Sequence, residues 1–193
     1  MAVAEVAGGV EGAGRGPSAL GVGTIVWLAS ELMFFAGLFA AYFTLRSIND
    51  AWPPSDVDLE LLRPAIFTGV LVASSFTMHG AVAAGRRRDR PSAIRWLALT
   101  GLLGGAFLAN QGIEYAEASF SISSHAYGSM FFLMTGFHGL HVLGGLFFML
   151  AVAGVIAGRS RAPAEATVDM CAYYWHFVDV VWVGMFATIF LIR

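Results

Sequence analysis

The amino-acid sequence predicts an all-α membrane protein, a polytopic bundle with five transmembrane helices. Composition is the first reason: 58% of the 193 residues are hydrophobic and 12% are charged, whereas about a quarter of the residues of a soluble domain are charged. The second reason is that the chain contains five long apolar stretches, and roughly 20 apolar residues in a helix cross a bilayer. The net charge of -2 says nothing about partners, and nothing in the sequence resembles a nucleic-acid binder, which would need a basic surface.

The first two apolar stretches follow a short N-terminal segment. Residues 1–20 are rich in Gly and Ala and lack the basic segment and apolar core of a signal peptide, so we expect a flexible cytoplasmic tail. The first span runs from about Gly21 to Leu45, and the second runs from about Pro64 to Gly85. Turn-forming residues, including Pro53 and Pro54, separate the two spans.

Three further spans complete the predicted bundle. They run from about Ala93 to Ala118, from Tyr127 to Ala157 and from Ala172 to Ile192. The fourth span is long enough to tilt or to extend beyond the lipid. The sequence shows no internal repeat, and no large soluble segment separates the spans. Residues 21–193 are therefore predicted to form one five-helix transmembrane domain.

The distribution of arginine predicts the orientation of the bundle, because positive residues concentrate on the cytoplasmic side of a membrane. A cytoplasmic N-terminus would place most of the arginines inside. The eight inside would be Arg15, Arg86, Arg87, Arg88, Arg90, Arg95, Arg159 and Arg161, and the three outside would be Arg46, Arg63 and Arg193. We therefore expect the N-terminus inside and the C-terminus outside, as an odd number of spans allows.

Ionisable side chains occur inside every predicted span. They are Glu31, His79, Glu114, Glu117, His138, His141, His176 and Asp179. One such residue at the centre of a bilayer costs about 2.5 to 3.5 kcal/mol on insertion scales. We therefore expect these groups to face other helices and to pair there. Small residues such as Gly104 and Gly145 favour the close helix approach that this pairing needs.

Glu31 lies near the middle of the first span. At steps of three, four or seven residues it shares one side of the helix with Trp27, Leu38 and Tyr42. Three roles are open for this carboxyl group: a hydrogen-bond anchor between helices, a contact with a lipid headgroup, or a member of a proton relay.

His138 and His141 lie three residues apart in the stretch GFHGLHV of the fourth span. They could share a metal ion, but a complete site needs further ligands, and Glu114 or His176 would serve only if the bundle brought them to the pair. A haem would need axial ligands on facing helices, and the five histidines do not form such pairs. We favour a hydrogen-bonded structural pair over metal or haem.

The fifth span carries His176 and Asp179, which lie three residues apart and so share one side of the helix. Tyr173, Tyr174 and Trp175 immediately precede this pair. Aromatic residues gather at membrane interfaces, so we expect these three to anchor the span at the inner interface, with His176 and Asp179 near its inner end.

Four segments on four different spans resemble subunit III of the haem–copper oxidases. They are WLASELMFFAGLFAAYF (27–43), QGIEYAEASFSI (111–122), AYGSMFFLMTGFHGLHVLGG (126–145) and YYWHFVDVVWVGMFATIF (173–190). The resemblance extends in order over about residues 21–193, and it is strongest to the short aa3-type form found in actinobacteria.

This resemblance implies a multi-pass subunit of a bacterial plasma-membrane oxidase that carries no redox centre of its own. Its partners would be subunit I, which holds haem a, haem a3 and copper, subunit II, which receives electrons from cytochrome c, and subunit IV. The subunit would support assembly, proton uptake and sustained turnover of subunit I in the aerobic respiratory chain. The resemblance also implies bound phospholipid and association with a cytochrome bc1-type complex in a supercomplex.

The matching motifs carry family features over to particular residues. Glu31, in SELMFF, is similar to the family's buried helix carboxyl, which is associated with carbodiimide reactivity and a lipid-lined interior. His138 and His141 match GFHGLHV, and His176 and Asp179 match WHFVD; the family assigns no metal to them. The longer form has two additional helices that make one arm of a V-shaped lipid cleft, and this chain starts at what would be the third helix.

Two alternatives to this function remain open. A quinol oxidase or a nitric oxide reductase has a related accessory subunit with the same five-helix core. An independent ion transporter could use Glu31 and the histidines as a relay, although transporters often show repeats and broken helices, which this sequence lacks.

Overall fold

The computed structural model describes residues 19–55, 57, 60–158 and 164–192. These residues form helices α1 (Ala19–Ser47), α2 (Leu62–Arg86), α3 (Arg90–Glu117), α4 (Ala126–Ala157) and α5 (Ala164–Phe186), and α5 continues into the π-helical turn η1 (Ala187–Leu191). Within the described ranges, five helices are long and apolar enough to cross a membrane. The predicted all-α class and the five spans are thus confirmed. The predicted N-terminal tail, residues 1–20, lies almost entirely outside the described residues.

The beginnings of two helices follow from local capping. The Asp89 side chain accepts a hydrogen bond from the Ser92 backbone N–H at 3.2 Å, and Pro91 occupies the first turn of α3. His125 caps α4 in the same way, because its Nδ1 accepts from the Gly128 N–H at 2.8 Å. Such caps satisfy backbone donors that a helix start leaves unpaired.

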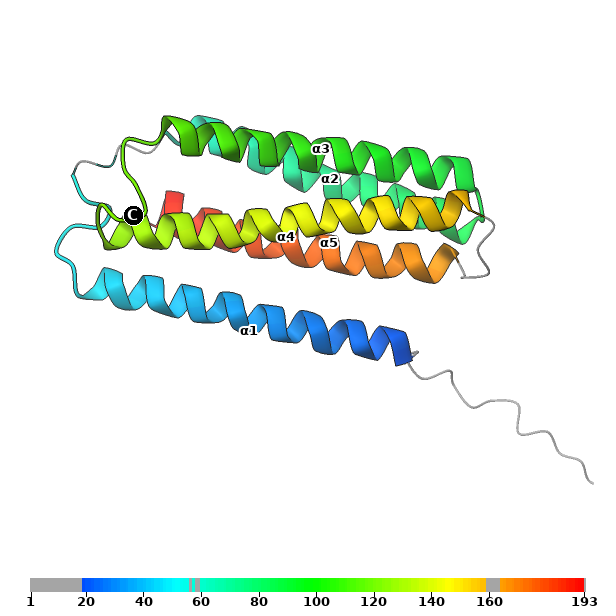
Figure 1. Cartoon of the computed structure of the whole chain (residues 1–193), viewed down its shortest axis with the longest axis horizontal. Helices are drawn as coiled ribbons and strands as arrows, with labels where there is room; N and C mark the ends of the chain where they lie inside the picture. Colours follow the sequence, from blue (N-terminus) through cyan, green and yellow to red (C-terminus); the bar gives the residue numbers. More distant parts are fainter. Residues whose placement is uncertain (1–18, 56, 58–59, 159–163, 193) are drawn as a thin grey trace, which may run out of the picture.

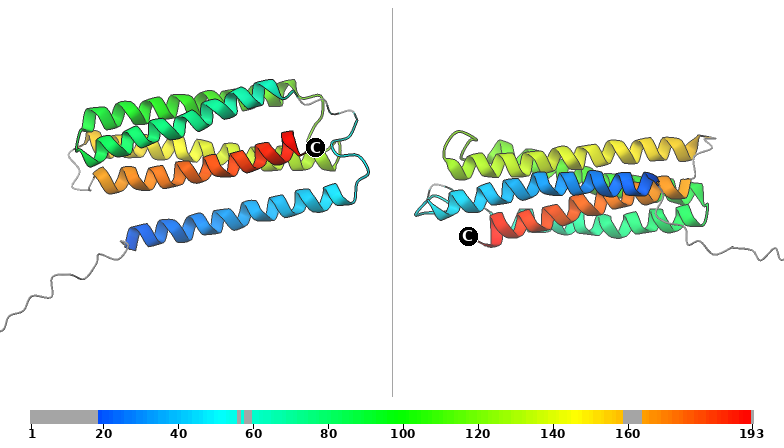
Figure 2. Two further views of the ribbon diagram at one scale, coloured as in Figure 1. Left: turned by 180° about the vertical axis from the view of Figure 1, so that it is seen from behind. Right: turned by 90° about the horizontal axis from the view of Figure 1, so that it is seen from below.

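The helix axes run roughly along one common direction, and the helices lie in three layers (Figure 1). α4 and α5 form the middle layer, α2 and α3 cover it on one side, and α1 lies alone on the other. Figure 2 shows the same layers from behind, where α2, α5 and α1 face the viewer. α1 packs against α4 and α5, and within its described side chains it buries only Phe35 and Tyr42 fully. The first helix is therefore the least covered by the rest of the chain.

The centre of the four-helix part is filled by Trp175. Its indole ring is 0% exposed, and its Nε1 donates to the Ser74 hydroxyl of α2 at 2.8 Å. A Cβ atom placed on Gly104 of α3 would lie 2.5 Å from this ring, and one on Gly145 of α4 would lie 2.8 Å from it. These two glycines therefore make the space that the indole occupies, which is the close packing expected of small residues.

The fifth helix corrects a prediction. α5 begins at Ala164 and not at the predicted Ala172, because a helix continues through polar residues that hydropathy excludes from a span. Trp175 consequently lies well inside the helix and is buried, so its predicted role as an interfacial anchor is wrong. Tyr174 is also buried, and only Tyr173, 59% exposed, remains on the surface. His176 and Asp179 lie near the middle of the helix, and not near its inner end.

Candidate functional site

The ionisable residues of the spans fall into three polar groups, and each group joins different helices. The first joins α1 to α4 and α5, and contains Glu31 and His141. The second joins α2 to α5, and contains His176 and Asp179. The third lies where the start of α2 meets the end of α3, and it contains Glu114. His138 belongs to none of the three.

The first group is centred on the contact between Glu31 of α1 and His141 of α4. The Glu31 Oε2 atom lies 3.1 Å from His141 Nε2, and Glu31 Oε1 accepts a hydrogen bond of 3.1 Å from Trp27 Nε1. His141 Nδ1 lies 2.7 Å from the carbonyl oxygen of Phe137. Both oxygens of the carboxyl group and both nitrogens of the imidazole are therefore engaged.

This geometry fixes how many protons Glu31 and His141 hold between them. A carbonyl oxygen only accepts, so His141 Nδ1 must carry hydrogen toward Phe137. The contact between Nε2 and Oε2 then needs one further proton, which belongs either to a neutral Glu31 or to a cationic His141. The pair is electrically neutral overall in both cases, which makes it tolerable among apolar side chains.

Two aromatic residues complete the first group. The Tyr174 hydroxyl of α5 donates to the backbone carbonyl of His141 at 2.9 Å. The Tyr174 ring also stacks on Trp27 of α1, with ring centroids 5.2 Å apart and planes 7° from parallel. Tyr174 thus contacts α1 and α4 at once, and the group ties α1 to both helices of the middle layer.

The second group contains a hydroxyl between a histidine and a carboxyl. Ser75 Oγ of α2 lies 3.0 Å from His176 Nδ1 and donates to Asp179 Oδ2 by a short hydrogen bond. Since that hydroxyl has a single proton, His176 Nδ1 must donate to it. Asp179 is 5% exposed, and its other oxygen, Oδ1, has no hydrogen-bond partner among the described residues.

The arrangement of Ser75, His176 and Asp179 differs from that of a hydrolase. In a catalytic triad the histidine lies between the serine and the carboxylate, whereas here the serine lies between the other two. His79 extends the group along α2: its Nδ1 donates to the Ser75 carbonyl at 2.9 Å, and its ring centroid is 4.7 Å from that of His176. The group is thus a hydrogen-bonded contact between two helices.

Hydroxyl groups continue this contact along α2. Thr68 Oγ1 accepts from Trp182 Nε1 at 2.9 Å, and Thr68 lies about two helical turns before Ser75, which donates to Asp179. Sequence reasoning missed Thr68, Ser74 and Ser75, since single hydroxyl residues are common in membrane helices. The seven-residue spacing between Thr68 and Ser75 is the signal that places these two hydroxyl groups on one face of α2.

The two histidines of GFHGLHV have different surroundings. The ring of His138 is buried and contacts the rings of Phe107 of α3, at 5.9 Å between centroids, and Trp182 of α5, at 4.9 Å. Neither of its ring nitrogens has a hydrogen-bond partner among the described residues. His141 alone therefore takes part in a hydrogen-bond network, and the expected hydrogen-bonded pair divides into one packed and one bonded histidine.

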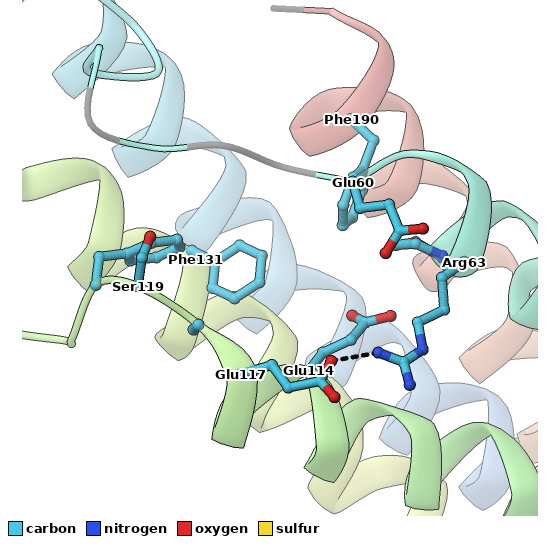
Figure 3. Close-up of a pocket in the computed structure, with 10 residues that line it drawn as sticks. Glu60, Arg63, Glu114, Glu117, Ser119, Phe131 and Phe190 are labelled. Atoms are coloured by element: carbon cyan, nitrogen blue, oxygen red, sulfur yellow. Dashed lines mark hydrogen bonds and ion pairs between the residues drawn. The ribbon is translucent and has the colours of Figure 1, made fainter.

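The third group lines a pocket of about 280 Å³ (Figure 3). Arg63, in the first turn of α2, forms an ion pair with Glu117 at the end of α3. Glu114 lies beside this pair and accepts a hydrogen bond of 2.7 Å from Asn110 Nδ2. Glu60 adds a third carboxyl group, and the aromatic rings of Phe131 and Phe190 form part of the wall.

The bundle does not bring Glu114 or His176 to the His138–His141 pair. Among the residues that the structure describes, no three His, Cys, Asp or Glu side chains are grouped so as to hold a metal ion. Glu114 lies with Asn110, and His176 lies with Ser75. The candidate residues are thus distributed over separate helix contacts.

An apolar groove runs between α1 and α5. It has a volume of about 320 Å³ and is lined by Leu32, Phe35, Ala36, Phe39, Val180, Val181 and Gly184. In a bilayer, such a surface between two spanning helices faces acyl chains or an apolar helix.

Five membrane-length helices, joined by polar contacts between buried or half-buried side chains, define an integral membrane protein of the polytopic helical class. A family model described as cytochrome c oxidase subunit III matches residues 13–192. The chain belongs to that family, as the motifs on the four spans predicted.

Several relatives cover most of the chain. A probable cytochrome c oxidase subunit 3 of Nocardia farcinica is 49% identical, over 92% of this chain and 90% of the relative. The cytochrome c oxidase subunit 3 of Corynebacterium diphtheriae is 45% identical, with the same two coverages of 92% and 90%. That of a Synechocystis species is 39% identical, over 88% of this chain and 74% of the relative. The chain is therefore similar to oxidase subunits of actinobacteria and of Synechocystis.

Proposed function

We propose that this chain is a non-catalytic core subunit of an aa3-type cytochrome c oxidase in a bacterial plasma membrane. It supports assembly, proton uptake and sustained turnover of a catalytic subunit I, in which haem a, haem a3 and copper reduce oxygen. Membership of the subunit III family supports the association with an oxidase. Subunit II, subunit IV, a bc1-type complex and phospholipid are the further partners in this proposal.

One observation about the residues carries the non-catalytic part of the proposal. The central polar pair of the spans is engaged in a contact between helices: Glu31 and His141 use all their side-chain polar atoms on each other, on Trp27 and on a carbonyl group. His176 is bound through its Nδ1 to Ser75, which in turn donates to Asp179. Groups used in this way hold helices together, so His141 is a poor candidate for a haem or copper ligand.

The orientation is part of the same proposal. The connection between α2 and α3 carries Arg87 and Arg88 and lies between helix ends at Arg86 and Arg90. Positive residues in short connections favour the cytoplasmic side. We therefore place this connection and the N-terminus inside, and the pocket of Glu114 outside.

The proposal includes phospholipid bound in the groove between α1 and α5. The groove between α1 and α5 is lined by apolar side chains alone, and acyl chains match such a surface by their apolar character. In the longer family form two more helices make one arm of a V-shaped lipid cleft; in this chain lipid or a neighbouring subunit takes the place of that arm beside α1.

The test is affinity purification of the tagged chain from its native membrane in a mild detergent, followed by a visible absorption spectrum and a subunit analysis. We expect haem a absorbance together with subunits I and II, and oxygen consumption with reduced cytochrome c. The isolated chain should show no haem absorbance. Stoichiometric haem or copper on the isolated chain would overturn the proposal.

The same preparation separates the alternatives. Activity with quinol and none with cytochrome c would favour a quinol oxidase, and nitric oxide reduction would favour the corresponding reductase. Proton flux in liposomes that contain this chain alone would favour an ion transporter.

A further inference from the structure

The strongest unassigned feature is a polar patch on the outer surface of α2 and α5. We call it the α2–α5 patch and define it by Ser75, Phe76, His79 and His176. His79 is exposed and His176 is partly exposed, and their rings are neighbours. Behind them, the buried Asp179 accepts from Ser75 and completes the hydrogen-bonded group. The imidazole rings of His79 and His176 thus reach the surface of the bundle.

The patch lies at the depth of the hydrocarbon core. At a rise of about 1.5 Å per residue, His79 lies about 8 Å from the midpoint of α2, within the roughly 15 Å half-thickness of the core. Ionisable groups at this depth are costly when they face lipid, and they normally face the interior of a protein. An exposed histidine there therefore indicates that another polypeptide covers it.

The outer surface of α4 provides the contrast. Its exposed large side chains are Leu133, Phe137, Leu140, Leu143, Phe147 and Leu150. Every one of them is apolar, as expected for a surface that faces lipid. Two outer surfaces of the same bundle thus differ at mid-membrane depth, because the one on α2 and α5 carries the exposed His79, whereas the exposed side chains of α4 are all apolar.

The exposed side of α2 also permits a close approach of another helix. Ala65, Gly69 and Ala73 follow one another at four-residue spacing along this side, and all three are exposed. A Cβ atom on Gly69 would meet nothing within 4 Å. Small residues at this spacing let two membrane helices pack closely enough for side-chain hydrogen bonds between them.

We propose that the α2–α5 patch docks a transmembrane helix of another subunit of the oxidase, and that this helix presents a hydrogen-bond donor at the depth of His79. The donor follows from the geometry. His79 Nδ1 donates to the Ser75 carbonyl, so a neutral His79 has Nε2 left as an acceptor. A hydroxyl, amide or indole N–H group of the partner fits this atom. The inference rests on the proposed function because that function supplies the neighbouring subunits.

The test is site-specific photocrosslinking in the intact oxidase. Benzoylphenylalanine is introduced at Phe76, which is 74% exposed in the patch, and in a matched variant at Phe147, which is 63% exposed on α4. After irradiation in native membranes, we expect the Phe76 variant to be joined to a membrane-spanning oxidase subunit, identified by mass spectrometry. The Phe147 variant should be joined mainly to lipid.

The outcomes separate this inference from the proposed function. Crosslinks from Phe76 to lipid alone, in an oxidase that retains the subunit, would overturn the docking surface and leave the proposed function intact. Equal yields of protein crosslinks from Phe76 and Phe147 would also overturn it, because the α2–α5 patch would then contact other subunits no more than the outer surface of α4 does. Failure of the unmodified chain to co-purify with any oxidase subunit would overturn the proposed function itself.

A substitution supplies an independent readout. His79→Leu should lower the fraction of the subunit that stays with the oxidase during a detergent wash by several-fold, and His79→Gln should restore part of it, since an amide oxygen also accepts. A lipid-facing histidine predicts the opposite sign, because leucine suits lipid better than histidine does. Unchanged or improved retention of the His79→Leu variant would overturn the inference.

Discussion

At the residue scale, Glu31 illustrates how a carboxyl group is accommodated between membrane helices. It has an indole donor on its own helix and an imidazole on α4, and it shares a single proton with that imidazole. A carboxyl group held in this way joins helices without a net charge. His138 represents the other solution, a histidine packed among aromatic rings.

We predict that Glu31→Gln and Glu31→Ala differ in stability. The amide of glutamine can accept from Trp27 and donate to His141 Nε2, so the Gln variant should unfold almost as the native protein does. The Ala variant should lose roughly 1 to 2 kcal/mol, as for other hydrogen bonds between membrane helices. Unfolding in mixed detergent measures both. Equal destabilisation by the two changes would show that the hydrogen bonds to Glu31 contribute little.

The cap of α3 predicts a dependence on pH outside the membrane. Hydrogen bonds from the Ser92 side chain and then from its backbone N–H hold the pKa of Asp89 below its ordinary value. A depressed pKa contributes stability that is present above the unfolded-state pKa and is lost as pH falls through the folded-state pKa. Asp89→Asn keeps a capping side chain without a titrating group. The melting-temperature advantage of the native protein over this variant should therefore decline on acidification, and a constant difference would contradict the prediction.

At the scale of the elements, α5 holds the four-helix part together. It places Trp175 against glycines of α3 and α4, and it meets α2 through Ser74, Ser75 and Thr68. α2, α3 and α4 therefore each have a surface shaped for α5. α1, in contrast, is attached mainly through the Glu31 group and two fully buried aromatic residues.

The glycines of α3 offer a matched test of this packing. Gly104→Ala should destabilise the bundle by about 1 to 3 kcal/mol, because the new methyl group would meet the buried indole ring. A Cβ atom on the adjacent Gly105 meets nothing within 4 Å, so Gly105→Ala should be nearly neutral. Thermal unfolding in detergent checks both variants. A Gly104→Ala variant as stable as its neighbour would show that Trp175 can move at little cost.

Much of this organisation could be predicted from the sequence, because the length of an apolar stretch is a local property. The five spans follow from it, and the side of α1 that carries Glu31 follows from residue spacing, which is also local. The start of α5 does not: hydropathy measures the part that lipid contacts, while the helix itself extends through Glu165 and Asp169. The separate surroundings of His138 and His141 were equally inaccessible, since three-residue spacing permits a shared side of a helix but does not identify the neighbours.

At the scale of the whole molecule, the connections at the two ends of the bundle differ in charge. Arg86, Arg87, Arg88 and Arg90 are at the end where α2 passes into α3. The opposite end carries the carboxyl groups of the Glu114 pocket. This asymmetry is the physical basis for the proposed orientation.

Cysteine labelling would check that orientation. The native Cys171 is buried, so it should react little with a membrane-impermeant maleimide. Arg87→Cys should be labelled only when the cytoplasmic side is accessible, and Ser123→Cys, in the α3–α4 connection, only from outside. The reverse pattern in sealed vesicles of known sidedness would show that the bundle is inserted the other way round.

The position of Trp175 has a consequence for biosynthesis. α5 is the last of the five helices to be translated, yet it carries the side chain that fills the space between Gly104 and Gly145. While α1 to α4 are already in the membrane, the surfaces of α3 and α4 that await the indole must face lipid or one another. The middle of the bundle therefore acquires its final packing only after the ribosome has synthesised α5, and a nascent chain stalled before Trp175 would leave that space for a chaperone or a lipid to occupy.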